Sequence, residues 1–111
     1  TTEIYTLSLH DALPILQAAL KDCNEALRLR PNFVDALDSR GLMNLKGGQN
    51  KNAIADFDAA LKINPRLTSS LYGRGLAKKR NGAVAEGDLD IANAKAMDPN
   101  IVKEFADYGV Q

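Results

Sequence analysis

Three aspartates recur at a fixed spacing and are the first candidates for chemistry. Asp22, Asp56 and Asp90 are equally spaced along the chain. Carboxylates that converge in a fold can bind a metal ion or exchange protons. The same spacing separates Arg40 from Arg74, however. We therefore predict that the aspartates lie on the surfaces of successive helices and pair with these arginines, where an exposed pair contributes at most about 1 kcal/mol. No metal or catalytic site is predicted.

Cys23 is the only cysteine in the chain. A lone cysteine excludes an internal disulfide and a multi-cysteine metal site. Phe57 and Ile91 hold the equivalent place one and two periods later. We expect a buried, inert thiol, not a redox centre.

The opening segment, "TTEIYTLSLHDALPI" (1–15), differs in composition and period from the rest. Translated back into codons, it resembles a short-read sequencing adapter read in frame. We interpret residues 1–15 as a non-native segment and expect poor docking or disorder. The stretch "TLSLHDAL" could form a helical turn or two, with Pro14 opening the next helix. Ser8, His10 and Asp11 therefore receive no catalytic role.

Charge and hydropathy exclude two further classes. The 14 basic and 14 acidic residues balance to a net charge of zero, whereas nucleic-acid binding depends on clustered positive charge. The basic run "AKKR" (77–80) ends a predicted helix, where it complements the helix dipole. No apolar run approaches the roughly 18 residues that a membrane span needs. We predict neither a nucleic-acid nor a membrane partner.

Prolines mark the elements that must position all these residues. Pro31, Pro65 and Pro99 share the spacing of the aspartates. A period of about 34 residues is typical of stacked supersecondary units. Apolar spacing predicts helices over about 16–29, 33–46, 51–63, 67–80 and 83–97. Glycine turns separate the members of each pair. The stripe in "IVKEFADYGV" predicts a short capping helix that Gly109 ends.

These residues resemble the tetratricopeptide repeat family over about residues 16–101. Leu37 and Gly41 fit its first helix, and Ala53, Phe57 and Ala60 fit its second. The predicted divisions are 1–15, the second helix of a truncated repeat at 16–33, complete repeats at 34–67 and 68–100, and a capping helix and tail at 101–111. In the second complete repeat, Gly87 and Ile91 stand where alanine and an aromatic residue are usual, which indicates softer packing there.

The resemblance implies an all-α solenoid of antiparallel helix pairs, without cofactors, that works as a non-catalytic protein–protein interaction module from a larger bacterial protein. First helices of successive repeats line a groove for a peptide or partner helix. The implied groove residues are Asp35, Asp38, Ser39, Leu42, Leu45, Lys46, Ser69, Tyr72, Leu76, Lys79 and Arg80. Ser39 and Gly73 stand where one branch of the family has the asparagine of a carboxylate clamp, so we do not expect that specialisation.

Two alternatives stay open. The chain could be a regulatory or targeting C-terminal region of a larger enzyme, for example one associated with a protease. It could also self-associate weakly through the edge next to residues 1–15, where we expect Leu16, Leu20 and Leu27 to be exposed. The compartment stays open between cytoplasm and periplasm.

Overall fold

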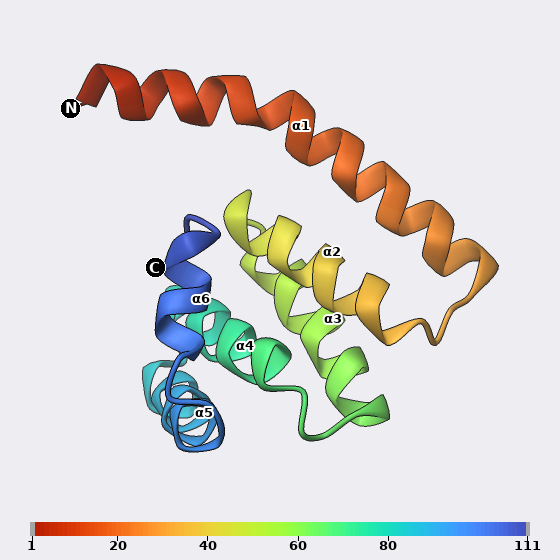
Figure 1. The fold of residues 1–111 in the computed structure, drawn as a ribbon, viewed down its shortest axis with the longest axis vertical. Coiled ribbons are helices and arrows are strands. Elements are labelled where there is room, and N and C mark those ends of the chain that lie inside the picture. Colours follow the sequence, from red (N-terminus) through yellow and green to blue (C-terminus); the bar gives the residue numbers. More distant parts are fainter. Residues whose placement is uncertain (1, 111) are drawn as a thin grey trace.

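The computed structural model describes the backbone of residues 2–110 and the side chains of residues 14–110. All regular secondary structure in this part of the chain is helical, and it contains no strand. In chain order the helices are α1 (Thr2–Leu29), α2 (Val34–Lys46), α3 (Asn50–Ile63), α4 (Thr68–Arg80), α5 (Val84–Met97) and α6 (Ile101–Asp107) (Figure 1). The prediction of an all-α protein is confirmed.

The turns after α2 and α4 have the same geometry, one repeat apart. Gly48 and Gly82 adopt φ values of +79° and +97°, which favour glycine because it lacks a Cβ. Beyond them, the Gln49 amide donates to the Asn44 carbonyl and the Ala83 amide donates to the Lys78 carbonyl, both at 2.8 Å. These bonds cap the helix ends. The glycine turns thus end α2 and α4 where the sequence predicts. The other bounds of helices α2–α5 also lie close to their predicted positions.

Helix α1 is longer than predicted. We expected it to start near Leu16, after Pro14, but it begins at Thr2 and runs through the proline. An internal proline removes one backbone hydrogen bond and weakens a helix without always ending it. The prediction of poor docking for residues 1–15 concerns mainly side chains outside the described residues. The N-terminal half of α1 extends past the other helices (Figure 1).

Each described helix packs mainly on its neighbours in the chain. Helix α2 contacts α1 and α3, and α4 contacts α3 and α5. Helices α2 and α4 also touch directly, and α6 packs against α4 and α5. Within the described part, the backbone of α1 comes close to that of α2 alone among the helices. Successive helices are thus layered in sequence order.

The main core is built around Phe57 of α3, which is fully buried. A Cβ added to Gly41 of α2 would lie 2.6 Å from the Phe57 ring, and one added to Gly73 of α4 would lie 2.5 Å from it. The ring is therefore held between two helices that approach it through glycine. A smaller cluster of Leu27, Ala36, Leu37 and Ala60 joins α1, α2 and α3.

Packing between α4 and α5 is tighter than the sequence indicated. A Cβ on Gly87 would lie 2.5 Å from both the Gly75 carbonyl oxygen and the Lys79 Cγ. The expectation of softer packing at Gly87 is wrong, because the missing methyl group lets the two backbones come together. Ile91 packs, half-buried, against the main core.

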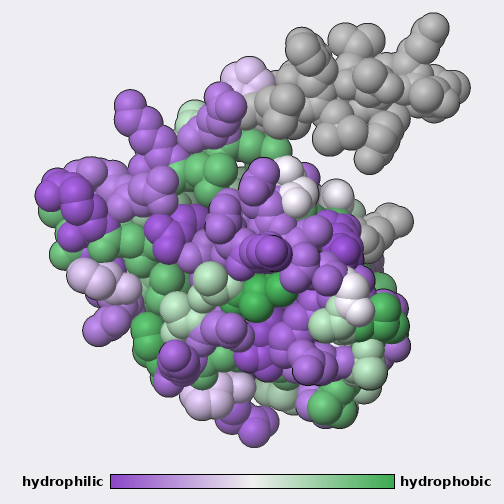
Figure 2. All heavy atoms as spheres, turned by 180° about the vertical axis from the view of Figure 1, so that it is seen from behind, coloured by the Kyte–Doolittle hydropathy of each residue, from purple (hydrophilic) through white to green (hydrophobic). Residues whose placement is uncertain are grey.

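The surface is mixed in character. In Figure 2, hydrophobic residues form separate areas among hydrophilic ones rather than one continuous face. Exposed large apolar residues are scattered over α1, α3, α5 and α6, among them Leu29, Ile63, Leu89 and Val102. No described helix is long and apolar enough to cross a membrane.

Candidate protein-binding face

Helices α2 and α4 are joined side by side through one carboxylate. The Ser69 hydroxyl donates to Asp38 Oδ2 at 2.8 Å, and the Ser70 hydroxyl donates to Asp38 Oδ1 at 2.6 Å. Ser70 is fully buried. Burial raises the pKa of Asp38, the two serine hydroxyls oppose this change, and the negative charge of Asp35 adds to it. The contact fixes the spacing of the two helices expected to line a groove.

The residues predicted to line the groove fall into three groups. Five are exposed and four are half-buried, and these nine define what we call the α2–α4 face. The exposed ones are Asp35, Ser39, Lys46, Lys79 and Arg80, and the half-buried ones are Asp38, Leu42, Ser69 and Leu76. The remaining two, Leu45 and Tyr72, are buried.

The structure corrects the predicted groove at two positions, Leu45 and Tyr72, because both side chains are buried. Leu45 is fully buried within the main core, and its carbonyl accepts a hydrogen bond from Arg80 Nη1 at 3.2 Å. The Tyr72 ring packs edge-on against Phe105 of α6, with ring centroids 4.7 Å apart. The short C-terminal helix therefore covers part of α4 that the sequence assigned to a partner.

Lys79 is directed toward α5. Its ammonium group pairs with Asp88 at 2.9 Å, and its stem lies beside Gly87. The two side chains are 42% and 57% exposed, so the pair is weak. Lys79 thus belongs to the rim of the α2–α4 face rather than to its centre.

The aspartate–arginine pairs predicted from the sequence are present in both complete repeats. Arg40 of α2 donates from Nε and Nη2 to Asp56 of α3, the shortest contact being 2.7 Å. Its Nη1 donates to Asn24 of α1 at 2.9 Å. Hydrogen bonding by Asp56 raises the pKa of Arg40. One side chain therefore connects three helices.

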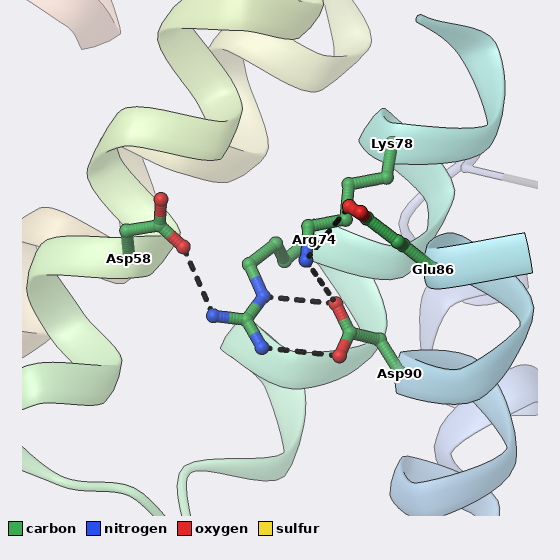
Figure 3. Close-up of polar contacts among 5 residues, drawn as sticks. All are labelled: Asp58, Arg74, Lys78, Glu86 and Asp90. Atoms are coloured by element: carbon green, nitrogen blue, oxygen red, sulfur yellow. Dashed lines mark hydrogen bonds and ion pairs between the residues drawn. The ribbon is translucent and has the colours of Figure 1, made fainter. Parts of the chain in front are cut away.

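Arg74 repeats the arrangement in the next unit (Figure 3). It donates to Asp90 of α5 at 2.8 and 3.0 Å and to Asp58 of α3 at 2.9 Å. Lys78 adds ion pairs to Asp90 at 3.3 Å and to Glu86 at 4.0 Å. Asp56 and Asp90 expose only 8% and 9% of their side chains, so these pairs are more buried than predicted. Asp22, the third member of the series, is exposed.

Cys23 is half-buried rather than buried. Burial raises the pKa of its thiol, an effect that Arg40 opposes. A raised pKa leaves little thiolate at neutral pH, and thiolate is the reactive form. Among the described residues, no group of histidine, cysteine, aspartate or glutamate side chains could hold a metal ion.

The apolar edge expected on α1 is also corrected. Leu16 and Leu27 are each only 8% exposed, and Leu20 is half-buried. Leu27 joins the smaller cluster with Leu37. The three leucines do not provide the open surface on which the self-association hypothesis was based.

Sequence reasoning missed the third member of each arginine network. Asn24 and Asp58 occupy equivalent positions, one repeat apart, and both accept from an arginine. The shared feature is an acceptor oxygen rather than a residue type, which a search for identical residues overlooks.

The chain matches no protein-family model and no curated protein.

Proposed function

We propose that the chain is a tetratricopeptide-type α-solenoid and works as a non-catalytic module that binds a peptide or partner helix along the α2–α4 face. In this proposal, α2 with α3 and α4 with α5 are the antiparallel pairs of two complete repeats. Helix α6 caps the array. The partner is a polypeptide.

One observation carries the solenoid part of the proposal. The Arg40–Asp56 contact returns one sequence period later as Arg74–Asp90, and in both the arginine Nε and Nη2 atoms donate to the carboxylate. The contact of Arg40 with the preceding unit, at Asn24, likewise returns as that of Arg74 with Asp58. Contacts that recur at the sequence period are expected when identical units stack by the same rotation. The recurring backbone bonds after Gly48 and Gly82 support the same reading.

The composition of the α2–α4 face supports a polypeptide partner. Leu42 and Leu76 are half-buried at equivalent positions of α2 and α4, so each leaves apolar surface for a partner's anchor. Lys46 and Arg80 lie in the last turns of the same helices. Apolar anchors surrounded by charge are typical of partner-binding surfaces. Basic residues at this end favour a partner segment that carries acidic side chains.

Calorimetry with two helical peptides tests the proposal. Both peptides carry the same apolar stripe, and their polar face is acidic in one and basic in the other. We expect the acidic peptide to bind more tightly. Lys46→Glu should weaken it by about fivefold, which corresponds to ~1 kcal/mol for an exposed charge.

Lys95→Glu is the matched control, because Lys95 is exposed on α5, away from the α2–α4 face. It should leave the affinity for the acidic peptide unchanged. Equal binding of both peptides, no binding, or equal effects of the two substitutions would contradict the proposal.

The two alternatives predict other results. A self-associating module would show a molar mass that rises with concentration in light scattering, without added peptide. A regulatory or targeting region of an enzyme would alter the activity of the catalytic part to which it is joined. Neither outcome is expected from a monomer that binds peptides.

A further inference from the structure

A polar cleft of 370 Å³ lies between α1, α2 and α3. Its walls carry the Arg40–Asp56 pair and three asparagines, Asn24, Asn44 and Asn52. Leu20 and Ala55 supply the apolar part of the lining. The volume falls within the range of small-ligand sites, which is about 300–1,000 Å³.

The cleft is separate from the α2–α4 face. Arg40 and Asn44 each lie two positions from Leu42 on α2. With about 3.6 residues per turn, residues two apart point to nearly opposite sides of a helix. A ligand in the cleft would therefore contact the other side of α2 from a partner on the α2–α4 face.

The next repeat shows what distinguishes the cleft. At the equivalent places between α3, α4 and α5, the arginine–aspartate pair is retained as Arg74–Asp90. Lys78 and Glu86 stand there in place of Asn44 and Asn52. These longer side chains approach one another to 4.0 Å across the space (Figure 3). In the first unit, the shorter amides leave the corresponding space open.

The three amides retain hydrogen-bonding capacity. Asn24 accepts from Arg40 through Oδ1, and Asn44 donates to Asp56 through Nδ2. Their other amide atoms, and both polar atoms of Asn52, make no hydrogen bond with another described residue. A carboxamide offers an N–H donor beside a carbonyl acceptor. This combination is complementary to another amide group.

Charge narrows the ligand class. Arg40 is the cation of the cleft, and its charge is already matched by the bidentate contact with Asp56. A phosphate or carboxylate would therefore find no unmatched positive charge. No aromatic residue lines the cleft, so a nucleobase or sugar would have no stacking surface. An uncharged ligand that both donates and accepts hydrogen bonds fits best.

We propose that this cleft is a second binding site, which takes an amide-rich, uncharged ligand such as an extended peptide segment. Asn24, Asn44 and Asn52 pair with its amides, and Leu20 and Ala55 contact its apolar parts. The amides can come from the peptide main chain or from asparagine and glutamine side chains. The two sources share the same donor and acceptor pattern.

Nuclear magnetic resonance of the ¹⁵N-labelled chain tests this site with capped peptides at millimolar concentration. The probes are capped triglycine, capped Gly-Asn-Gly and capped Gly-Asp-Gly. We expect the side-chain amide signals of Asn24, Asn44 and Asn52 to shift with the first two and less with the acidic one. A larger shift with Gly-Asn-Gly than with triglycine would identify a side-chain amide as the ligand.

Two variants exchange the chemistry of the two repeats. Asn52→Glu introduces the residue of the second repeat near the start of α3, where an acidic side chain suits the helix dipole. It should abolish the shifts of Asn24 and Asn44 while the backbone spectrum stays folded. Lys78→Asn with Glu86→Asn should open an equivalent site and add peptide-dependent shifts at both new asparagines.

Three results would overturn the inference: no shift of the three native amides with either uncharged probe, shifts that persist in Asn52→Glu, or an equal response to the acidic probe. These outcomes are independent of peptide binding on the α2–α4 face, because that test uses charged helical peptides and Lys46→Glu.

Discussion

Phe57 fits between α2 and α4 because glycines face both sides of its ring. Gly41 and Gly73 come from different repeats, and neither leaves room for a Cβ beside the aromatic carbons. The resemblance placed this phenylalanine in the second helix of a repeat. It did not indicate that Gly73, named in the sequence only where one branch of the family has an asparagine, forms one side of the space that holds the ring.

Overpacking of the Phe57 ring by a methyl group at position 41 costs about 1–3 kcal/mol, and the gain in helix propensity offsets about 1 kcal/mol of this cost. We therefore expect Gly41→Ala to reduce the free energy of unfolding by up to about 2 kcal/mol. In a Phe57→Leu background the loss should shrink, since the smaller side chain frees space. Urea unfolding of the four proteins in this cycle measures the coupling.

Gly47→Ala is the matched control. Gly47 has φ near −82°, and a Cβ there would meet only the Met43 and Asn44 carbonyls, at 3.4 and 3.7 Å. We expect a neutral or slightly stabilising change. Equal losses for Gly41→Ala and Gly47→Ala would show that backbone effects, not the ring, explain the result.

Asp38 gives the stability a pH dependence of opposite sign to that of a salt-bridged carboxylate. Its folded-state pKa is raised above the usual 3.8, mainly by burial. Its contribution to stability is therefore complete below the usual pKa and is lost as the pH rises through the folded-state pKa. We expect wild-type stability, relative to Asp38→Asn, to fall as the pH rises above the usual pKa of 3.8 and through the raised folded-state pKa.

Denaturant unfolding of both proteins at several pH values gives this difference, in which the other carboxylates cancel. A difference that is constant with pH, or that grows toward neutral pH, would contradict the stated sign. Asp35→Asn serves as a check, because removing that neighbouring charge should make the decrease smaller.

At the scale of helices, each arginine of the repeat connects the helix before it to the helix after it. We expect Arg40→Met to cost roughly 1.5–3 kcal/mol, since it removes hydrogen bonds to a charged group and leaves Asp56 buried. Thermal and urea unfolding measure the loss. Methionine retains much of the apolar stem, so the change mainly reports on the guanidinium group.

Arg28→Met is the control for that substitution. Arg28 pairs with Glu25 at 2.7 Å, but the two side chains are 67% and 57% exposed. Exposed pairs of this kind contribute little. Similar losses at positions 28 and 40 would mean that burial of the carboxylate has no influence.

Helices between the prolines could be predicted from the sequence because apolar spacing, glycine turns and proline stops agree there. The start of α1 could not, since composition alone does not decide whether a helix continues through Pro14. The place where α6 packs on α4 could not be predicted either. Its stripe was recognised, but the contact of Phe105 with Tyr72 depends on where the cap lies on α4.

For the whole molecule, local patterns identified which residues are polar and periodic but not which surfaces stay open. Nine of the eleven predicted groove residues retain exposure, whereas Leu45 and Tyr72 are buried. The cleft beside Asn24 could not be predicted, because it depends on how three helices are placed. The sequence shows that Lys78 stands one period after Asn44. Its effect on the cleft becomes clear only from the equivalent positions that the two side chains occupy in the structure.

The two hydrophobic clusters differ in size and in how they are closed. The smaller one relies on Leu27 of α1, whereas the larger extends from α2 to Val110, which follows α6. Because the backbone of α1 comes close to that of α2 alone among the described helices, loss of α1 would expose the smaller cluster and leave the larger one intact. Heating should therefore fray this molecule from its amino-terminal side, with amide protons of α1 exchanging before those around Phe57.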